Sequence, residues 1–167
     1  TNVNVAPGIC YGQTDVDVAE TFENEAQVIK KQIENIAFDK VYSSPLIRCK
    51  KLAEYLFKTN IIYDARLREL HFGEWEMQAW DKIQHPELNK WMIDFVNTPC
   101  PGGESFIDLH NRVKHFLTDL KKKNHSQVVI ISHGGTIRSI LSHTQNIPLK
   151  DSFKISVKHG DVTKIDL

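Results

Sequence analysis

The chain has 167 residues, equal numbers of basic and acidic side chains and hence a formal net charge of zero, with 41% hydrophobic residues. That length suits one domain with a sizeable core, and the balanced charge predicts no nucleic-acid or membrane-surface partner. No apolar run approaches the roughly 20 residues that a membrane-spanning helix needs. Three widely spaced cysteines, Cys10, Cys49 and Cys100, outline neither a disulfide framework nor a metal site. We therefore expect a single domain over residues 1–167 in a reducing compartment, the cytoplasm.

The N-terminal part of the chain is expected to contain a loop, a helix, a strand and a second helix. Residues 1–17 lack any sustained period and read as a loop. Apolar residues at spacings of three and four then predict a helix over Phe22–Ile36. A short strand over Phe38–Tyr42 leads to Ser44, a good N-cap, and to Pro45, which suits the first position of the helix that follows. Arg48 lies one turn inside that helix, where it is either a solvated surface residue or a clamp for an oxyanion.

A dense mixture of charged and aromatic residues follows the next predicted strand, Ile61–Tyr63. Residues 66–76 show neither helical nor strand alternation, which in a loop suggests a site rather than core. Three carboxylates, Glu69, Glu74 and Glu76, compete there for an acid–base role, and the pattern alone does not choose among them.

The middle of the chain is expected to be helical. Short helices broken near Pro86 carry Trp80 and Trp91, which we interpret as core rather than as a lid over a pocket. After a turn-rich connector, a long helix presents one apolar face, and its last turn carries a basic run that complements the helix dipole. That face consists of Phe106, Leu109, Val113, Phe116, Leu117 and Leu120.

The stretch from Gln127 to Thr136 is expected to be the centre of the fold. Val128–Ile131 are four β-branched residues and read as a parallel strand buried on both faces. His133 and two glycines follow directly, and a helix begins at about Thr136. Open α/β sheets place ligand chemistry at such strand ends, although a lone histidine is more often only a strand cap. With closing strands over residues 153–157 and 162–167, the order of elements predicts a three-layer α/β/α domain with a mostly parallel sheet.

Three motifs, in this order and spacing, resemble those of the histidine phosphatase superfamily, also called phosphoglycerate mutase-like. They are Ser43-Ser44-Pro45-Leu46-x-Arg48, Leu67-x-Glu69-x-x-Phe72-Gly73-x-Trp75-Glu76 and Ser132-His133-Gly134-Gly135. The resemblance covers essentially the whole chain. The first loop, residues 6–15, is most similar to the α-ribazole phosphatase branch, which acts in cobalamin assembly.

The resemblance implies a phosphomonoesterase that works without cofactor or metal through a phosphorylated histidine. It assigns Arg48 and His133 to catalysis and to the phosphate, and Glu69 to proton transfer. Gly134, Gly12 and Asn4 are further expected contacts with the phosphate or substrate. The Arg-His motif that carries the family's nucleophile is absent from the printed residues. Thr1 matches the position just after it, so the histidine and the first strand are expected immediately upstream.

Other functions remain open at this point. Within the family, a broad-specificity phosphatase on small esters is the first alternative, and no extra arginine pair favours a mutase. A catalytically inactive module that binds phosphate esters would explain an absent nucleophile. If the domain were purely structural, the presence of Arg48, Glu69 and His133 at these positions would be a coincidence.

Overall fold

Three parallel strands form the central sheet of the computed structural model, which describes residues 1–58, 60–83 and 86–167. Strand β1 (Lys40–Ser43) lies between β2 (Ile61–Tyr63) and β3 (Val128–Ile131). Ser43, the last residue of β1, is in register with Tyr63 and with Ile131, the last residues of its two neighbours. All three strands therefore end at one edge of the sheet, where their following loops meet.

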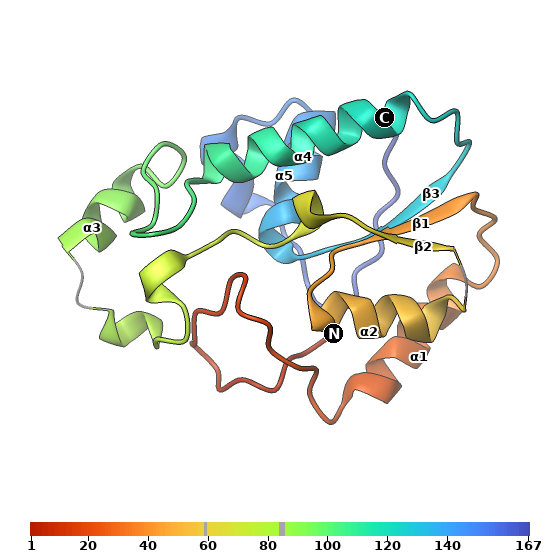
Figure 1. The fold of residues 1–167 in the computed structure, drawn as a ribbon, viewed down its shortest axis with the longest axis horizontal. Helices are drawn as coiled ribbons and strands as arrows, with labels where there is room; N and C mark the ends of the chain where they lie inside the picture. The colour runs from red at the N-terminus through yellow and green to blue at the C-terminus, as the bar shows by residue number, and fades with distance from the viewer. Residues whose placement is uncertain (59, 84–85) are drawn as a thin grey trace.

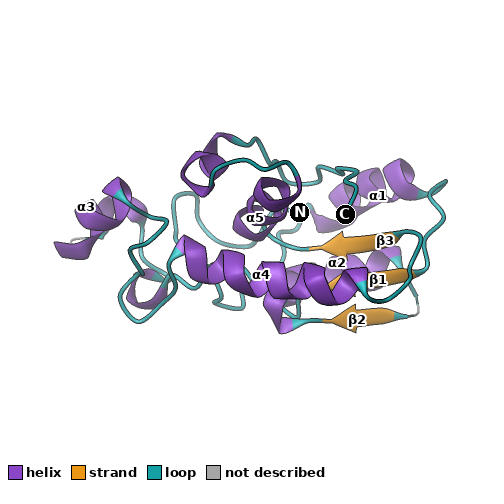
Figure 2. Ribbon diagram, turned by 90° about the horizontal axis from the view of Figure 1, so that it is seen from above, coloured by secondary structure: helices purple, strands orange, loops and turns teal. Residues whose placement is uncertain are grey.

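Helices cover both faces of this sheet (Figure 1). Helices α1 (Phe22–Ile33) and α2 (Ile47–Leu56) lie on one face, and α4 (Phe106–Lys121) and α5 (Gly134–Thr144) lie on the other. Helix α3 (Pro86–Ile93) stands apart from the sheet, at one end of the molecule (Figure 2). The predicted α/β fold with a parallel sheet between helical layers is confirmed.

Alternation along the strands divides the core into two parts. Tyr42 points to the α4 face, where it joins Phe106, Leu109 and the other apolar residues of that helix. Its neighbour Val41 points to the opposite face and packs on Cys49 and Ala53 of α2. Successive side chains of a strand point to opposite faces, so one four-residue strand supplies both cores.

A third apolar cluster lies under α3, away from the sheet. It is built around the fully buried Trp75, with Cys10, Cys100, Ile83 and the partly buried Trp80 and Trp91. The rings of Trp80 and Trp91 are stacked at 6.0 Å. These contacts agree with the interpretation of the two tryptophans as core.

Three details of the predicted fold were wrong. Strand β3 is an edge strand rather than the central one, and Val128–Ile130 are only partly buried because no described strand pairs with its outer edge. The closing strands are absent from the described residues: Leu149–Lys154 is a 3-10 helix, and residues 162–167 form no ladder, since Ile165 packs instead against the apolar cluster around α4. Helix α2 begins at Ile47, two residues after Pro45.

The start of α2 is capped from a distant loop. The Ser44 hydroxyl accepts a hydrogen bond from Leu46 N at 3.3 Å, and the Asp15 carboxylate accepts one from Ile47 N at 2.7 Å. A carboxylate at a helix N-terminus also interacts favourably with the helix dipole. The cap therefore depends on the first loop, which local sequence could not indicate. Among the described residues, no helix is long and apolar enough to cross a membrane.

Helix α4 supplies a test of local stabilisation. Ser105 and Asp108 form a reciprocal capping box, in which the Ser105 hydroxyl accepts from Asp108 N and the Asp108 carboxylate accepts from Ser105 N. We expect Ser105→Ala to lower the free energy of unfolding by about 1 kcal/mol. Urea denaturation measures this, and an unchanged midpoint would show that the box contributes nothing.

Candidate active site

The loops that follow the three strands line one groove. Its volume is about 910 Å³, and its lining includes Arg48, Glu69, His133 and Gly134. Arg48 follows β1, Glu69 follows β2 and His133 follows β3. The groove continues along the outer edge of β3, between that strand and residues 156–167. The parallel register therefore brings together three of the predicted catalytic residues.

His133 lies at the bottom of the site, 7% exposed. Its Nδ1 accepts a hydrogen bond from Arg48 Nε at 3.2 Å, and its Nε2 lies 2.7 Å from the Ser44 hydroxyl. With Nδ1 as acceptor, we assign the ring proton to Nε2, which donates to Ser44. Burial lowers the pKa of His133 well below 6.5, and the positive charges of Arg48 and Arg112 lower it further. The imidazole is therefore neutral at physiological pH.

Arg48 is held by backbone carbonyls instead of carboxylates. Its guanidinium donates to Thr14 O at 3.1 Å and to Gly12 O at 2.6 Å, besides the contact with His133. It also lies over the ring of Tyr11, with its central carbon 5.3 Å from the ring centroid. A guanidinium has five N–H donors, so these three bonds leave two for a ligand. A cation that is 6% exposed and has no acidic partner among the described residues is suited to bind an anion.

The Glu69 carboxylate faces the start of helix α5. Its Oε2 accepts from Gly135 N at 3.0 Å, and its Oε1 accepts from Leu70 N at 2.8 Å. A Cβ at Gly135 would lie 2.3 Å from Oε1, so only glycine allows this approach. The Glu69 side chain and the His133 imidazole line the same groove. The structure therefore places this carboxylate in one groove with Arg48 and His133.

The other two carboxylates of the loop are engaged elsewhere. Glu76 accepts hydrogen bonds from the backbone N–H groups of Gln13, Thr14 and Phe72, at 2.9, 2.6 and 3.0 Å, and thereby holds the first loop. Glu74 is exposed and does not line the groove. Of the three candidates left open by the sequence, only Glu69 lies in the site.

Gly12 and Asn4 differ from these residues in their placement. The Gly12 carbonyl accepts a hydrogen bond from Arg48 and orients its guanidinium. A glycine is needed at this position because φ is positive, at 30°, and because an added Cβ would be too close to Glu76 and Leu70. Asn4 is exposed, its backbone N–H donates to Asp17 O, and it is not among the described residues that line the groove. The structure does not bring the Asn4 side chain to the other predicted residues.

Several site residues escaped the sequence analysis. Arg138 lines the same groove, with its Nε bonded to Ile155 O at 3.1 Å. Ser44, expected only as a cap, contacts His133. The Cys49 sulfur lies 3.5 Å from His133 Nε2, and burial raises the pKa of this thiol to about 12. Helical spacing in the sequence could have predicted that Arg138 lies one turn after Gly134. The contacts of Ser44 and Cys49 with His133 could not be predicted in this way, because they depend on the pairing of β1 with β3.

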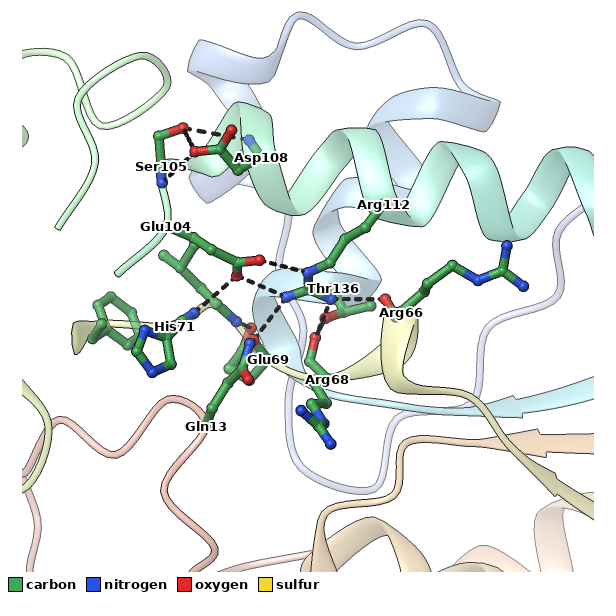
Figure 3. A network of polar contacts seen from close by, with 12 residues as sticks. Gln13, Arg66, Arg68, Glu69, His71, Glu104, Ser105, Asp108, Arg112 and Thr136 are labelled. Carbon is green, nitrogen blue, oxygen red and sulfur yellow. Dashed lines mark hydrogen bonds and ion pairs between the residues drawn. The ribbon is translucent and has the colours of Figure 1, made fainter. Parts of the chain in front are cut away.

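A network of polar contacts supports the Glu69 loop from behind (Figure 3). Arg112 of α4 donates to backbone carbonyls of this loop and to Glu104, and the Thr136 hydroxyl donates to Arg68 O at 2.7 Å. Within the described part of the chain, no group of three or more histidine, cysteine or acidic side chains could hold a metal ion. The arrangement offers an anion charge-assisted donors from protein alone.

Comparisons with known proteins give a matching family model and several similar proteins. The family model described as "Histidine phosphatase superfamily (branch 1)" matches residues 1–167. "Putative phosphoserine phosphatase 2" of Hydrogenobacter thermophilus is 30% identical over 166 residues, which cover 96% of this chain and 82% of that protein. "Adenosylcobalamin/alpha-ribazole phosphatase" of Salmonella typhimurium is 25% identical over 174 residues, covering 100% and 86%. Among solved structures, the alpha-ribazole phosphatase from Shigella flexneri superposes with a TM-score of 0.84 at 22% identity, covering 92% of this chain and 79% of that one.

The neutral state of His133 predicts a dependence of stability on pH. In the unfolded chain this histidine binds a proton near pH 6.5, whereas in the native state its pKa is lower and it stays neutral at that pH. The resulting stability is present above that pH and is lost as the pH falls, with a slope of up to ~1.4 kcal/mol per pH unit. We expect the difference in free energy of unfolding between wild type and His133→Gln to shrink between about pH 7 and pH 5. Urea titrations across this range test it, and a constant difference would contradict a neutral His133.

Proposed function

The chain belongs to the histidine phosphatase superfamily (branch 1), and from this membership we propose that it is a phosphomonoesterase with a phosphohistidine intermediate. One observation carries the proposal: Arg48, Glu69 and His133 come from three separate strand ends and line a single groove. Arg48 and His133 are buried 3.2 Å apart, with no acidic partner for either among the described residues, and a purely structural role does not explain this arrangement.

The first step transfers the phosphoryl group to a histidine nitrogen. As the P–O bond to the ester oxygen breaks, negative charge develops on the phosphoryl oxygens and on the leaving alkoxide. The two free donors of Arg48 stabilise the phosphoryl oxygens, and Glu69 donates a proton to the alkoxide. By resemblance, the neutral His133 supplies a further donor to the phosphoryl oxygens, the Nε2–H that donates to the Ser44 hydroxyl in the structure.

The second step returns the enzyme to its initial state. Glu69, now ionised, accepts a proton from water, and the water oxygen attacks phosphorus as the P–N bond breaks. Inorganic phosphate leaves the groove. Glu69 can serve both steps because the N–H groups of Leu70 and Gly135 hold its carboxylate in one place.

By resemblance, we place the nucleophilic histidine immediately before Thr1. Two features support this position: Thr1 lines the same groove as His133, and the outer edge of β3 is unpaired among the described residues. A strand paired along the free edge of β3 would bring the residue before Thr1 next to Arg48 and His133. Such a strand would extend the sheet of the single domain that we propose for residues 1–167.

For the substrate, we propose α-ribazole 5′-phosphate, in cobalamin biosynthesis and in the cytoplasm. The similarity of the first loop and of the Salmonella relative supports the substrate, and the three free thiols suit a reducing compartment. Phosphoserine is the second candidate, because a relative with that name is 30% identical over nearly the whole chain. A broad-specificity phosphatase would accept both.

Phosphate trapping on the full-length protein tests this proposal. The protein is incubated with α-ribazole 5′-phosphate, phosphoserine or p-nitrophenyl phosphate, quenched, and mapped by peptide mass spectrometry. We expect acid-labile phosphate on a histidine directly before Thr1 and the highest kcat/KM for α-ribazole 5′-phosphate. A preference for phosphoserine would change the substrate, and turnover without a labelled histidine would refute the mechanism. Binding of all three esters without turnover would indicate an inactive binding module.

Glu69→Gln tests the proton-transfer role. The amide is nearly isosteric but cannot donate a proton as a carboxylic acid does, so we expect turnover of an alkyl phosphate to fall by roughly two to four orders of magnitude. Affinity for inorganic phosphate should remain largely unchanged. Glu74→Gln is the matched control, since Glu74 is exposed on the same loop and outside the groove. Equal rates for both variants would remove Glu69 from the mechanism.

A further inference from the structure

Arg112 uses every donor of its guanidinium on the far side of the Glu69 loop. Its Nε and one N–H of its second terminal nitrogen donate to the two carboxylate oxygens of Glu104, at 2.8 and 3.0 Å. Its remaining three donors reach the backbone carbonyls of Arg66, Arg68 and Glu69, at 2.7, 2.8 and 2.8 Å. Five donors thus meet five acceptors, a pattern that only the planar guanidinium can make.

Glu104 extends this clamp beyond Glu69. Its Oε2 also accepts from His71 N at 3.0 Å, and its own backbone N–H donates to His71 O at 2.8 Å. The ion pair is mostly buried, with 18% of the Arg112 side chain and 23% of the Glu104 side chain exposed. Arg112 and Glu104 therefore form hydrogen bonds with the backbone on both sides of Glu69, from residue 66 to residue 71 (Figure 3).

These backbone contacts also fix the position of the Glu69 carboxylate. Leu70 N and Gly135 N hold its two oxygens at 2.8 and 3.0 Å, and the bond from Gly135 requires the loop backbone to stay at one distance from the start of α5. A displacement of about 1 Å at an acid–base group is enough to cost roughly a hundredfold in rate. Neither Arg112 nor Glu104 lines the groove in the described part of the chain.

We propose that Arg112 and Glu104 are positioning residues for the general acid: they set the efficiency of Glu69 without touching the substrate. The rate effects expected from this inference rest on the proposed function, whereas the contacts of Arg112 and Glu104 do not. The size of the rate effect should depend on the leaving group of the ester. An alkoxide must receive a proton as it departs, but p-nitrophenolate leaves without one, so a misplaced acid slows hydrolysis of the first ester much more than of the second.

The variant Arg112→Lys keeps the charge and removes the fork of donors. For an alkyl phosphate that the wild type hydrolyses, we expect kcat/KM to fall by about ten- to a hundredfold, while the value for p-nitrophenyl phosphate changes by less than about threefold. Glu104→Gln should show the same pattern with a smaller loss, since the backbone bonds of Arg112 remain. Glu69→Gln provides the reference for complete loss of the acid.

Arg66→Lys is the matched control. Arg66 is in the same loop and pairs with Asp64 and Asp119, both at 2.7 Å, but its side chain makes no bond to the backbone of residues 68–71. Its loss should affect both esters equally and by less than about threefold. Equal losses on both esters in Arg112→Lys, or no loss at all, would overturn the proposal.

Amide hydrogen exchange separates this inference from the proposed function. In Arg112→Lys and Glu104→Gln, we expect exchange at Leu70 N and His71 N to accelerate by about tenfold or more, with no such change in Arg66→Lys. If the wild type hydrolyses no ester, the proposed function fails, and the exchange rates still decide whether the pair holds the Glu69 segment. Unchanged exchange at these two amides in both variants would show that the pair does not hold the Glu69 segment. This conclusion would stand even if either variant had a lower overall stability.

Discussion

The parallel register of three short strands is the constraint on which the site depends. Because Ser43 is paired with both Tyr63 and Ile131, the three strands end level with one another, and the chain leaves the sheet three times at the same edge. Arg48, Glu69 and His133 each lie within a few residues of one of those ends. A slip of one residue in β3 would turn its side chains to the opposite faces and would move His133 away from Ser44 and Arg48.

The surroundings of two guanidiniums, the buried one of Arg48 and the half-buried one of Arg112, explain why the first can bind an anion and the second cannot. All five donors of Arg112 are satisfied by protein, and its charge is balanced by Glu104. Arg48 is bonded only to carbonyls and to a neutral imidazole, so its charge and two donors remain for an anion. Burial amplifies this difference, because an uncompensated charge away from water attracts a counter-charge strongly. The same positive charges also contribute to keeping His133 neutral.

Periodicity predicted the helices and strands where packing follows local pattern. The apolar face of Phe106–Lys121 and the β-branched run of Val128–Ile131 lie where spacing placed them. The C-terminal residues 162–167 also resemble a strand in the sequence, but they pair with no strand among the described residues, and Ile165 packs against the apolar cluster around α4. Likewise, Ser44 has the chemistry of a cap, yet Asp15 of the first loop reaches the start of α2 and the helix begins at Ile47.

The sequence by itself determined the class of fold and the residue types at the strand ends, because strand and helix periods and glycine positions are local properties of the chain. It also indicated that a carboxylate between residues 69 and 76 belongs to the site. The residue pattern did not choose among the three, and the family resemblance pointed to Glu69. Only the tertiary structure gave the physical distinction, since Glu69 lines the groove and accepts from Gly135 N, while Glu76 accepts from the first loop. The partners of Arg112 were equally invisible, because three backbone carbonyls can converge on one guanidinium only after α4 has packed against the loop that follows β2.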